Sequence, residues 1–282
     1  MTRHEYTLVD VFTDRKFSGN QLAVFGDGRG ISSETMQAVA KELLIAETTF
    51  VLPKEKDGDH KVRIFTPGRE LPFAGHPTIG TSWVLSGGRD GTLKLELGVG
   101  TIGVTVKDRF VEMEQPLPQF GAIVDDRGAV ARALSLALDD VVATAPIQQV
   151  SSGVPFTFVQ LRDLDAVQRI RMQRSPVKTA LYAFTTETVE PGSTLHARMF
   201  AGEALGIDED PATGSAQGPL AAYCVKYGIL PAAAEVRMRT EQGFEFGRRS
   251  ILDTRLSLRG SEITAVHAGG NVVDVGGGWM DL

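Results

Sequence analysis

The feature that most restricts how this chain can fold is a short pattern that occurs once in each half of the sequence. In the first copy the strand-like 63–65 precedes a turn at Gly75 by ten residues, and in the second copy 198–200 precedes Gly214 by fourteen. Small and apolar residues with helical character follow each glycine. The two glycines are 139 residues apart, about half of the 282-residue chain. We therefore predict two pseudo-equivalent halves, each mostly β-strand around one short helix.

Most of the remaining pattern favours short strands, so the predicted fold class is α+β. Alternating apolar and polar residues predict strands at 6–12, 21–25, 49–53, 61–67, 92–97, 101–108, 110–115, 156–161 and 194–200. Helices are predicted at 32–44, 129–138 and 214–228. Ser33 is a candidate N-cap for the first helix, whose single apolar stripe predicts one buried face. The proline-containing stretch 115–121 is the best linker candidate.

Composition excludes several classes of function. A net charge of −6 offers no basic stripe for nucleic acid, so a small-molecule substrate is expected instead. Cys224 is the single cysteine, which excludes a disulfide framework and a cysteine-rich zinc site and fits a reducing cytoplasm. The five histidines are scattered singly, so we expect no metal site. The first residues lack a signal-peptide pattern, and no apolar run approaches the roughly 18 residues of a membrane span, so no membrane partner is expected.

The stretch ELPFAGHPTIGTSWVL (70–85) places His76 where a helix is predicted to begin. Gly75 precedes this histidine and Pro77 follows it, a residue suited to the first turn of a helix. A polar cap is one interpretation of His76. If the helix after Gly214 begins opposite this one, unpaired N–H groups and two positive dipole ends would converge on a carboxylate or a developing oxyanion. Close backbone approach would then require both glycines, although ordinary turn geometry explains them equally well.

Two acidic residues are candidates for proton transfer at such a site. Glu47 lies between the predicted helix 32–44 and an apolar strand, where partial burial would raise the pKa of its carboxyl toward a value useful for a base. A solvated surface glutamate is the alternative. Asp210 belongs to an acidic group before the second helix, where helix-dipole effects alone favour acidic residues. Its position just before Pro211 would let it reach the cleft and bind a cationic group or tune His76.

Other motifs do not fit their usual chemistry. Gly98, Gly100 and Gly103 spell G-x-G-x-x-G, but a strand follows where a dinucleotide-binding fold needs a helix. The sequence contains no P-loop and no H-E-x-x-H. GSAQG differs from the G-x-S-x-G of serine hydrolases. These absences argue against a nicotinamide, flavin, nucleotide or zinc enzyme.

Six motifs together resemble the PhzF-like family, named for the isomerase of phenazine biosynthesis. They are SGNQLAVF, AETTFVLP, RIFTPGRELPFAGHPTIGT, RMF, EDPATGSAQGPLA and QGFEFGRRS, and their order and spacing match nearly end to end. The resemblance implies a diaminopimelate-epimerase-like fold of two pseudo-symmetric domains, each a β-barrel-like sheet wrapped around a central helix, usually as a homodimer. We expect one domain to comprise 1–117 with 265–282, and the other 118–264.

The resemblance also implies an active site between the domains that works without cofactor or metal. The family's isomerase converts trans-2,3-dihydro-3-hydroxyanthranilate to its ketone tautomer, moving a proton between carbons of a small cyclic carboxylic acid. By motif, Glu47 is the expected acid/base and His76 and Asp210 complete the catalytic set. The residues expected to bind a carboxylate substrate are Asn20, Gly75, Gly214 and Ser215.

Three positions depart from the family pattern. Ala46 stands where serine is common, Gln21 where GNP is usual, and Arg249 where GRPS is usual. These changes leave the exact substrate open.

Two other functions remain as alternatives. An amino-acid epimerase or racemase of the same fold would need a cysteine at each helix N-terminus, where this chain has His76 and Ser215, and Cys224 falls well inside the second helix. A non-catalytic protein that kept the fold and binds a small molecule is the other.

Overall fold

The computed structural model describes residues 2–201 and 208–282, and the order of its elements repeats. The first half contains β1 (Arg3–Val11), β2 (Asn20–Phe25), α1 (Ser33–Leu43), β3 (Glu47–Pro53), β4 (His60–Phe65), β5 (Glu70–Leu71), α2 (Gly75–Ser86), β6 (Gly91–Leu97), β7 (Gly100–Lys107) and β8 (Phe110–Glu114). The second half repeats this order with β10 (Gln148–Ser151), β11 (Pro155–Gln160), α4 (Leu164–Gln168), β12 (Ala180–Thr185), β13 (Leu195–Phe200), β14 (Glu209–Asp210), α5 (Gly214–Lys226), β15 (Glu235–Gln242), β16 (Ser250–Arg259) and β17 (Glu262–Asp281). The predicted internal repeat is confirmed.

A few short elements stand outside the repeat. Between the two halves lie β9 (Gln119–Ile123), α3 (Arg127–Ala133) and the 3₁₀ turn η1 (Leu138–Asp140). A second 3₁₀ turn, η2 (Phe244–Phe246), separates β15 from β16.

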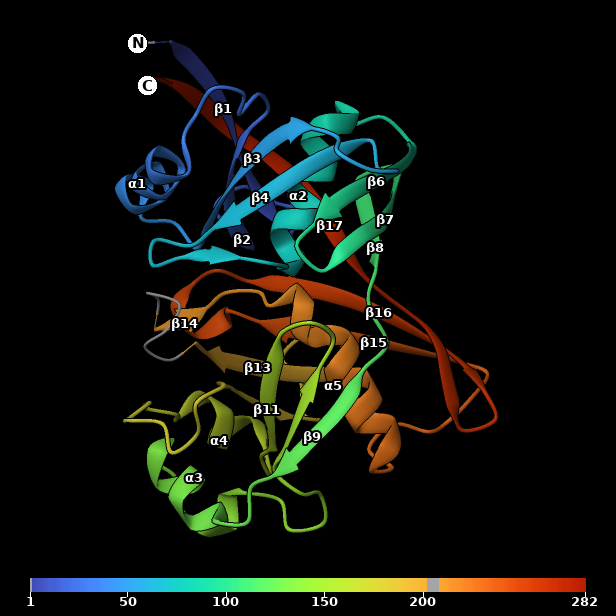
Figure 1. Ribbon diagram of the computed structural model, residues 1–282. Helices are drawn as coiled ribbons and strands as arrows, with labels where there is room; N and C mark the ends of the chain where they lie inside the picture. The colour runs from blue at the N-terminus through green and yellow to red at the C-terminus, as the bar shows by residue number, and fades with distance from the viewer. Residues whose placement is uncertain (1, 202–207) are drawn as a thin grey trace.

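The strands of the first half close into a ring. Pairing runs from β1 through β2, β3, β4, β6, β7 and β8 to β17, which returns to β1. Two pairs in this ring are parallel, β2 with β3 and β4 with β6, and the crossovers between them contain α1 and α2. The second half repeats this plan, since β11 pairs in parallel with β12 across α4, and β13 with β15 across α5. β17 belongs to both halves (Figure 1).

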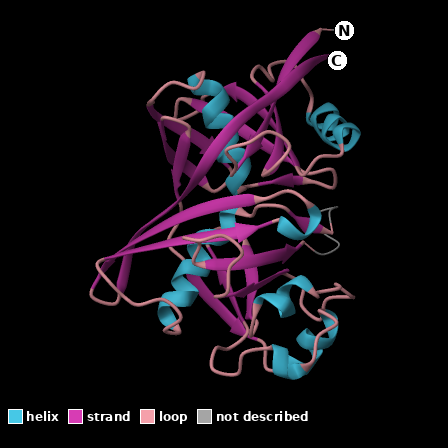
Figure 2. Cartoon of the chain, turned by 180° about the vertical axis from the view of Figure 1, so that it is seen from behind, coloured by secondary structure: helices cyan, strands magenta, loops and turns pink. Residues whose placement is uncertain are grey.

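Each half encloses one helix that is buried along most of its length (Figure 2). All residues of α2 from Gly75 to Trp83 are buried, as are those of α5 from Gly214 to Cys224. A helix that strands surround needs no polar face, so neither helix shows the one-sided stripe of α1. These two helices are the central helices predicted by the repeat, and the fold is the α+β, diaminopimelate-epimerase-like arrangement that we expected.

The hydrophobic cores support the predicted domain boundaries. One core surrounds α2 and draws mainly on residues 9–113, while another surrounds α5 and draws on residues 145–266. Within β17, Val266 packs into the second core whereas Ala268 and Val272 pack into the first. We therefore propose that the domains comprise 1–117 with 265–282, and 118–264.

Some local predictions need correction. The predicted strands of the first half form with ends that differ by a few residues, but Ser32 rather than Ser33 caps α1 by accepting a hydrogen bond from Thr35 N. The helix predicted at 129–138 ends at residue 133, because the chain turns through a positive φ of 58° at Ser135. Only the first part of the expected linker 115–121 is a connection without regular structure, since β9 begins at Gln119.

The N-termini of α2 and α5 touch each other at their glycines. A Cβ on Gly75 would lie 2.4 Å from the Ser215 nitrogen and 2.6 Å from Gly214 Cα. A Cβ on Gly214 would lie 2.7 Å from the ring of Phe12. Neither position has room for a side chain, so the helix contact at Gly75 and the packing against Phe12 at Gly214 explain these glycines better than turn geometry does.

We predict that Gly75→Ala destabilises the fold. The added methyl would overlap backbone atoms of α5, which cannot move as a flexible side chain can, so we expect a loss of about 1–3 kcal/mol or more in the free energy of unfolding. Urea titration measures this loss. Gly26→Ala is the matched control because nothing lies within 4 Å of its Cβ position. Equal stability of the two variants would contradict the close helix contact.

Candidate active site

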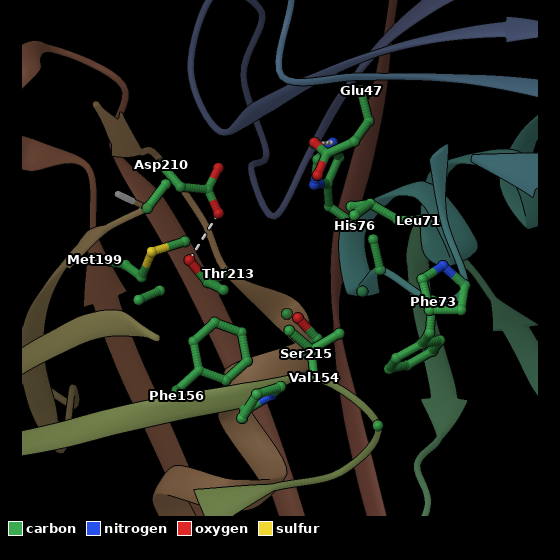
Figure 3. Close-up of a pocket in the computed structure, with 18 of the residues that line it drawn as sticks. Glu47, Leu71, Phe73, His76, Val154, Phe156, Met199, Asp210, Thr213 and Ser215 are labelled. Atoms are coloured by element: carbon green, nitrogen blue, oxygen red, sulfur yellow. Dashed lines mark hydrogen bonds and ion pairs between the residues drawn. The ribbon is translucent and has the colours of Figure 1, made fainter. Parts of the chain in front are cut away.

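A cavity of about 310 Å³ lies where the two halves meet. Its apolar wall is formed by Leu71, Phe73, Val154, Phe156 and Met199. Figure 3 shows Glu47 and His76 on one side of this cavity, with Asp210 and Thr213 on the other and Ser215 below them. The size suits a small cyclic molecule, and ionisable groups from both halves converge on a mostly apolar space.

The facing helix ends supply hydrogen-bond donors to this cavity. Gly75 and His76 begin α2, Gly214 and Ser215 begin α5, and all four line the cavity. Neither N-cap residue, Ala74 or Thr213, provides a side-chain cap. The first N–H groups of a helix have no intrahelical acceptor, and each helix dipole places positive charge at the same end. The arrangement therefore favours a carboxylate or a developing oxyanion.

Glu47 is the first residue of β3 and pairs in register with Leu22 of β2. Its side chain is only 12% exposed and lines the cavity. Its buried Oε2 accepts no hydrogen bond from the part of the chain that the structure describes. Burial, with a smaller contribution from the negative charge of Asp210, raises the pKa of this carboxyl well above its usual value of 4.5. A carboxyl group with these properties is suited to exchanging a proton with a ligand.

His76 is held as a neutral imidazole beside Glu47. Burial lowers its pKa to about 3, so it carries no charge at neutral pH. Nδ1 lies 3.1 Å from the side-chain nitrogen of Asn20, an obligate donor, while Nε2 lies 3.2 Å from the carbonyl oxygen of Gln21, an obligate acceptor. The proton therefore resides on Nε2, which also lies 3.2 Å from Glu47 Oε2. The ring N–H is directed at the Gln21 carbonyl and leaves Glu47 Oε2 free.

Asn20 connects the two halves behind the cavity. Its amide nitrogen donates to Asp210 Oδ1 at 2.6 Å and to the Ala212 carbonyl oxygen at 3.0 Å, besides its contact with His76. Asn20 is fully buried, and it does not line the cavity. Its contacts suit a residue that orients catalytic groups, whereas the sequence predicted direct substrate binding.

Asp210 is oriented by a network that the sequence did not identify. Thr213 Oγ1 donates to Asp210 Oδ2 at 2.7 Å, and Gln242 Nε2 donates to the Asp210 carbonyl oxygen at 2.7 Å and to Thr213 Oγ1 at 2.9 Å. The Gln242 oxygen accepts from Tyr182 Oη at 2.9 Å. Burial raises the pKa of Asp210, and the hydrogen bonds from Thr213 and Asn20 oppose this effect. Only the placement of Gln242 in QGFEFG hinted at its importance.

The structure brings most of the predicted residues together. The cavity is lined by Glu47, Gly75, His76, Asp210, Gly214 and Ser215. Gln21, one of the departures from the family pattern, contributes only its backbone carbonyl to His76. Arg249 pairs with Glu190 and Asp14 and does not line the cavity. Cys224 is buried inside the second core, as the sequence predicted.

Residues 2–201 and 208–282 offer neither a metal-binding cluster nor a membrane-spanning helix. Within this part of the chain no group of three or more His, Cys, Asp or Glu side chains is arranged to hold a metal ion. No helix there is long and apolar enough to cross a membrane.

The fold and the site together define a class of protein: two barrel-like halves whose central helices meet end to end beside a buried carboxyl group. A model of the phenazine biosynthesis-like protein family, PhzC-PhzF, matches residues 9–278. The chain is 35% identical to the trans-2,3-dihydro-3-hydroxyanthranilate isomerase of Pseudomonas chlororaphis over 99% of this chain and 100% of the relative. The chain therefore belongs to the PhzF family, and it is an isomerase.

Solved structures agree with this assignment. A phenazine biosynthesis protein of the PhzF family from Bacillus anthracis superposes with a TM-score of 0.90 at 25% identity, covering both chains fully. A hydroxyproline epimerase from Agrobacterium vitis superposes with a TM-score of 0.63 at 12% identity, over 98% of this chain and 92% of that one. The second likeness shows the shared fold alone.

We predict that Glu47→Gln makes the folded protein more stable at neutral pH. Because burial raises the pKa of Glu47 above 4.5, the folded protein binds this proton more tightly than the unfolded chain does. Wild-type stability therefore falls as the pH rises from that value through the raised pKa, by about 1.4 kcal/mol per pKa unit. The neutral amide has no such dependence, so the advantage of the variant should widen with pH.

Urea titrations at several pH values between about 5 and 8 test this stability prediction. Glu42→Gln, which removes an exposed carboxylate from α1, is the control and should show no widening. A stability difference for Glu47→Gln that stays constant across this range would contradict the proposed burial of charge.

Proposed function

We propose that this isomerase moves a proton between two carbons of a small cyclic carboxylic acid, as in the trans-2,3-dihydro-3-hydroxyanthranilate isomerases that it resembles. One observation carries this proposal. The carboxyl of Glu47, with a raised pKa and a free buried oxygen, lies in a cavity that is also lined by the N-termini of both central helices. A proton-transfer group and an anion-stabilising site therefore share one small space.

Proton transfer between carbons needs a group that both accepts and returns the proton. The ionised Glu47 would take the proton from one carbon, and the resulting carboxylic acid would deliver it to another. A raised pKa favours this role because it makes the ionised carboxylate a stronger base toward a carbon-bound proton. In this proposal a side chain of the protein, Glu47, carries out the proton transfer.

Negative charge that develops on the substrate needs stabilisation. Loss of a proton from carbon spreads charge through a conjugated ring toward its carboxylate, and fixed donors at the ends of α2 and α5 would stabilise that charge without reorganising. The backbone N–H groups of Gly75 and Gly214 and the hydroxyl of Ser215 are the proposed donors. Arg69 and Lys178 add positive charge at the cavity lining, one from each half. This electrostatic pattern supports an acidic substrate.

His76 and Asp210 complete the proposed site. The neutral His76, whose Nε2–H is directed at the Gln21 carbonyl oxygen, lies beside Glu47 without introducing a competing charge. Asp210 faces the cavity and is a candidate partner for a cationic or hydroxyl group of the substrate. Asn20 binds both residues, and we propose an orienting role for it.

Thiol-based racemisation is not supported by this site. A two-base racemase of this fold would need thiols at both helix N-termini, which are occupied here by His76 and Ser215. Cys224 lies in a later turn of α5, and burial raises the pKa of its thiol, which disfavours the reactive thiolate.

We propose, on other grounds, that the protein acts as a homodimer in the cytoplasm. The homodimer rests on the family resemblance, and the cytoplasm on the single cysteine.

We predict that Glu47→Gln abolishes most of the isomerase activity while ligand binding survives. The amide keeps the size and much of the hydrogen bonding of the side chain but cannot take the proton, so turnover of trans-2,3-dihydro-3-hydroxyanthranilate should fall by about 10²–10⁴-fold. Turnover is followed spectroscopically, and binding of an anthranilate-like acid by calorimetry. A folded variant with wild-type turnover would refute the proposed base.

We predict that Cys224→Ala leaves activity and folding largely intact. The thiol packs among apolar neighbours and is far along the helix from the cavity lining, so its loss removes packing but no chemistry. The same turnover assay and a thermal melt test this expectation. A well-folded Cys224→Ala protein with background activity would restore a thiol mechanism.

A further inference from the structure

The segment that leads into Asn20 follows an unusual path. Three residues between β1 and β2 have positive φ: Phe12 at 64°, Phe17 at 65° and Gly19 at 66°. Two of them are not glycine, and a bulky side chain in this region raises the conformational energy unless surrounding contacts compensate. Asn20 directly follows this turn, so its direction depends on what holds the turn in place.

Arg248, from the loop between β15 and β16, supplies those contacts. Its guanidinium donates to the carbonyl oxygens of Ser18 at 2.7 Å and Gly19 at 2.8 Å. The same group lies 2.6 Å from Asp10 Oδ1, and the other oxygen of Asp10 accepts from Phe17 N at 2.6 Å. Asp10 is 2% exposed and Arg248 18%, so the pair is largely withdrawn from water. The guanidinium of Arg248 thus connects the second half to the first half and holds the turn in place.

The loop that carries Arg248 is itself anchored on the second half. Glu245 of η2 lies 2.7 Å from His196 Nε2, and Glu241 lies 2.8 Å from His196 Nδ1. His196 is fully buried, which opposes its charge, but its hydrogen bonds to the two glutamates raise its pKa to about 9. A protonated imidazole between two carboxylates holds the loop firmly, so Arg248 starts from a fixed position.

We propose that Arg248 is a positioning residue for the active site: by holding the Phe17–Gly19 turn through Asp10 and two carbonyl groups, it aims the Asn20 amide at His76 and Asp210. The two N–H groups of the Asn20 amide face three acceptors, in His76, Asp210 and Ala212, so at least one N–H is shared and a small displacement breaks a contact. The effect on the reaction rests on the proposed function, whereas the effect on His76 does not.

The first test observes His76 directly. Long-range ¹H–¹⁵N NMR spectra report which ring nitrogen carries the proton, and His76→Gln identifies the signals. Wild type should show the Nε2–H form, because Asn20 donates to Nδ1. In Arg248→Met we expect a mixture of tautomers. Arg248→Lys, which can still reach Asp10 but lacks the forked geometry, should restore the wild-type form in part.

The matched control is Arg249→Met. Arg249 is the next residue of the same loop, has a similar exposure of 22%, and pairs with Glu190 and Asp14. Its side chain reaches the segment between β1 and β2 at Asp14 and makes no bond to Phe17–Gly19, and the bond from Gly19 N to its backbone oxygen is kept. The control should therefore lose stability without changing the tautomer of His76. If Arg248→Met unfolds because Asp10 is left unpaired, the double variant with Asp10→Asn removes that buried charge.

The second test measures kinetics. Misplacement of catalytic groups without loss of the anion site should lower kcat by about 10–100-fold with little change in KM. Unchanged His76 signals in Arg248→Met, with a loss of stability equal to that of Arg249→Met, would overturn the proposal. If wild type does not turn over the hydroxyanthranilate substrate, the proposed function fails, but the NMR comparison still decides the role of Arg248.

Discussion

The contact between the N-termini of α2 and α5 determines much of this structure. Gly75 and Gly214 bring two helix backbones so close together that a Cβ on Gly75 would overlap backbone atoms of α5. Two positive dipole ends repel each other, so the contact itself is unfavourable unless negative charge is nearby. The cavity beside it contains Glu47 and Asp210, whose carboxyl groups burial shifts toward their neutral forms, so an acidic ligand would supply negative charge there. The helix ends thus give the unliganded site a positive potential that favours binding of an anion.

Burial sets the protonation states that such a site needs. The same withdrawal from water raises the pKa of Glu47 and Asp210 and lowers that of His76, so all three groups shift toward their neutral forms. A cavity with few resident charges responds strongly to the charge that a reaction creates. The buried carboxyl groups cost the fold stability, and a conflict of this kind is expected at functional sites.

The sequence predicted what local patterns and the internal repeat can specify. The alternating strands and the two helices that begin at glycines were predicted correctly, because such elements depend on neighbours along the chain. The two equivalent halves were predicted correctly because the same pattern occurs twice in the sequence. The C-terminal end of the helix expected at 129–138 was wrong, since its apolar residues cross a turn at Ser135 that composition does not reveal. Gln242 and Arg248 were missed for another reason. Their partners lie 32 and 238 residues away, in Asp210 and Asp10, and no local pattern encodes such contacts.

The repeat also explains why the site needs side-chain contacts between the two halves in addition to the strand that they share. Each half supplies one helix end, and proton transfer requires the two ends to stay in register within a fraction of an ångström. β17 passes through both sheets, but a long strand can bend between them. The Asn20 amide reaches across to Asp210 directly beside the cavity, and Arg248 reaches back to the turn before Asn20. These two contacts run in opposite directions between the halves, so together they restrict the sliding that either one alone would permit.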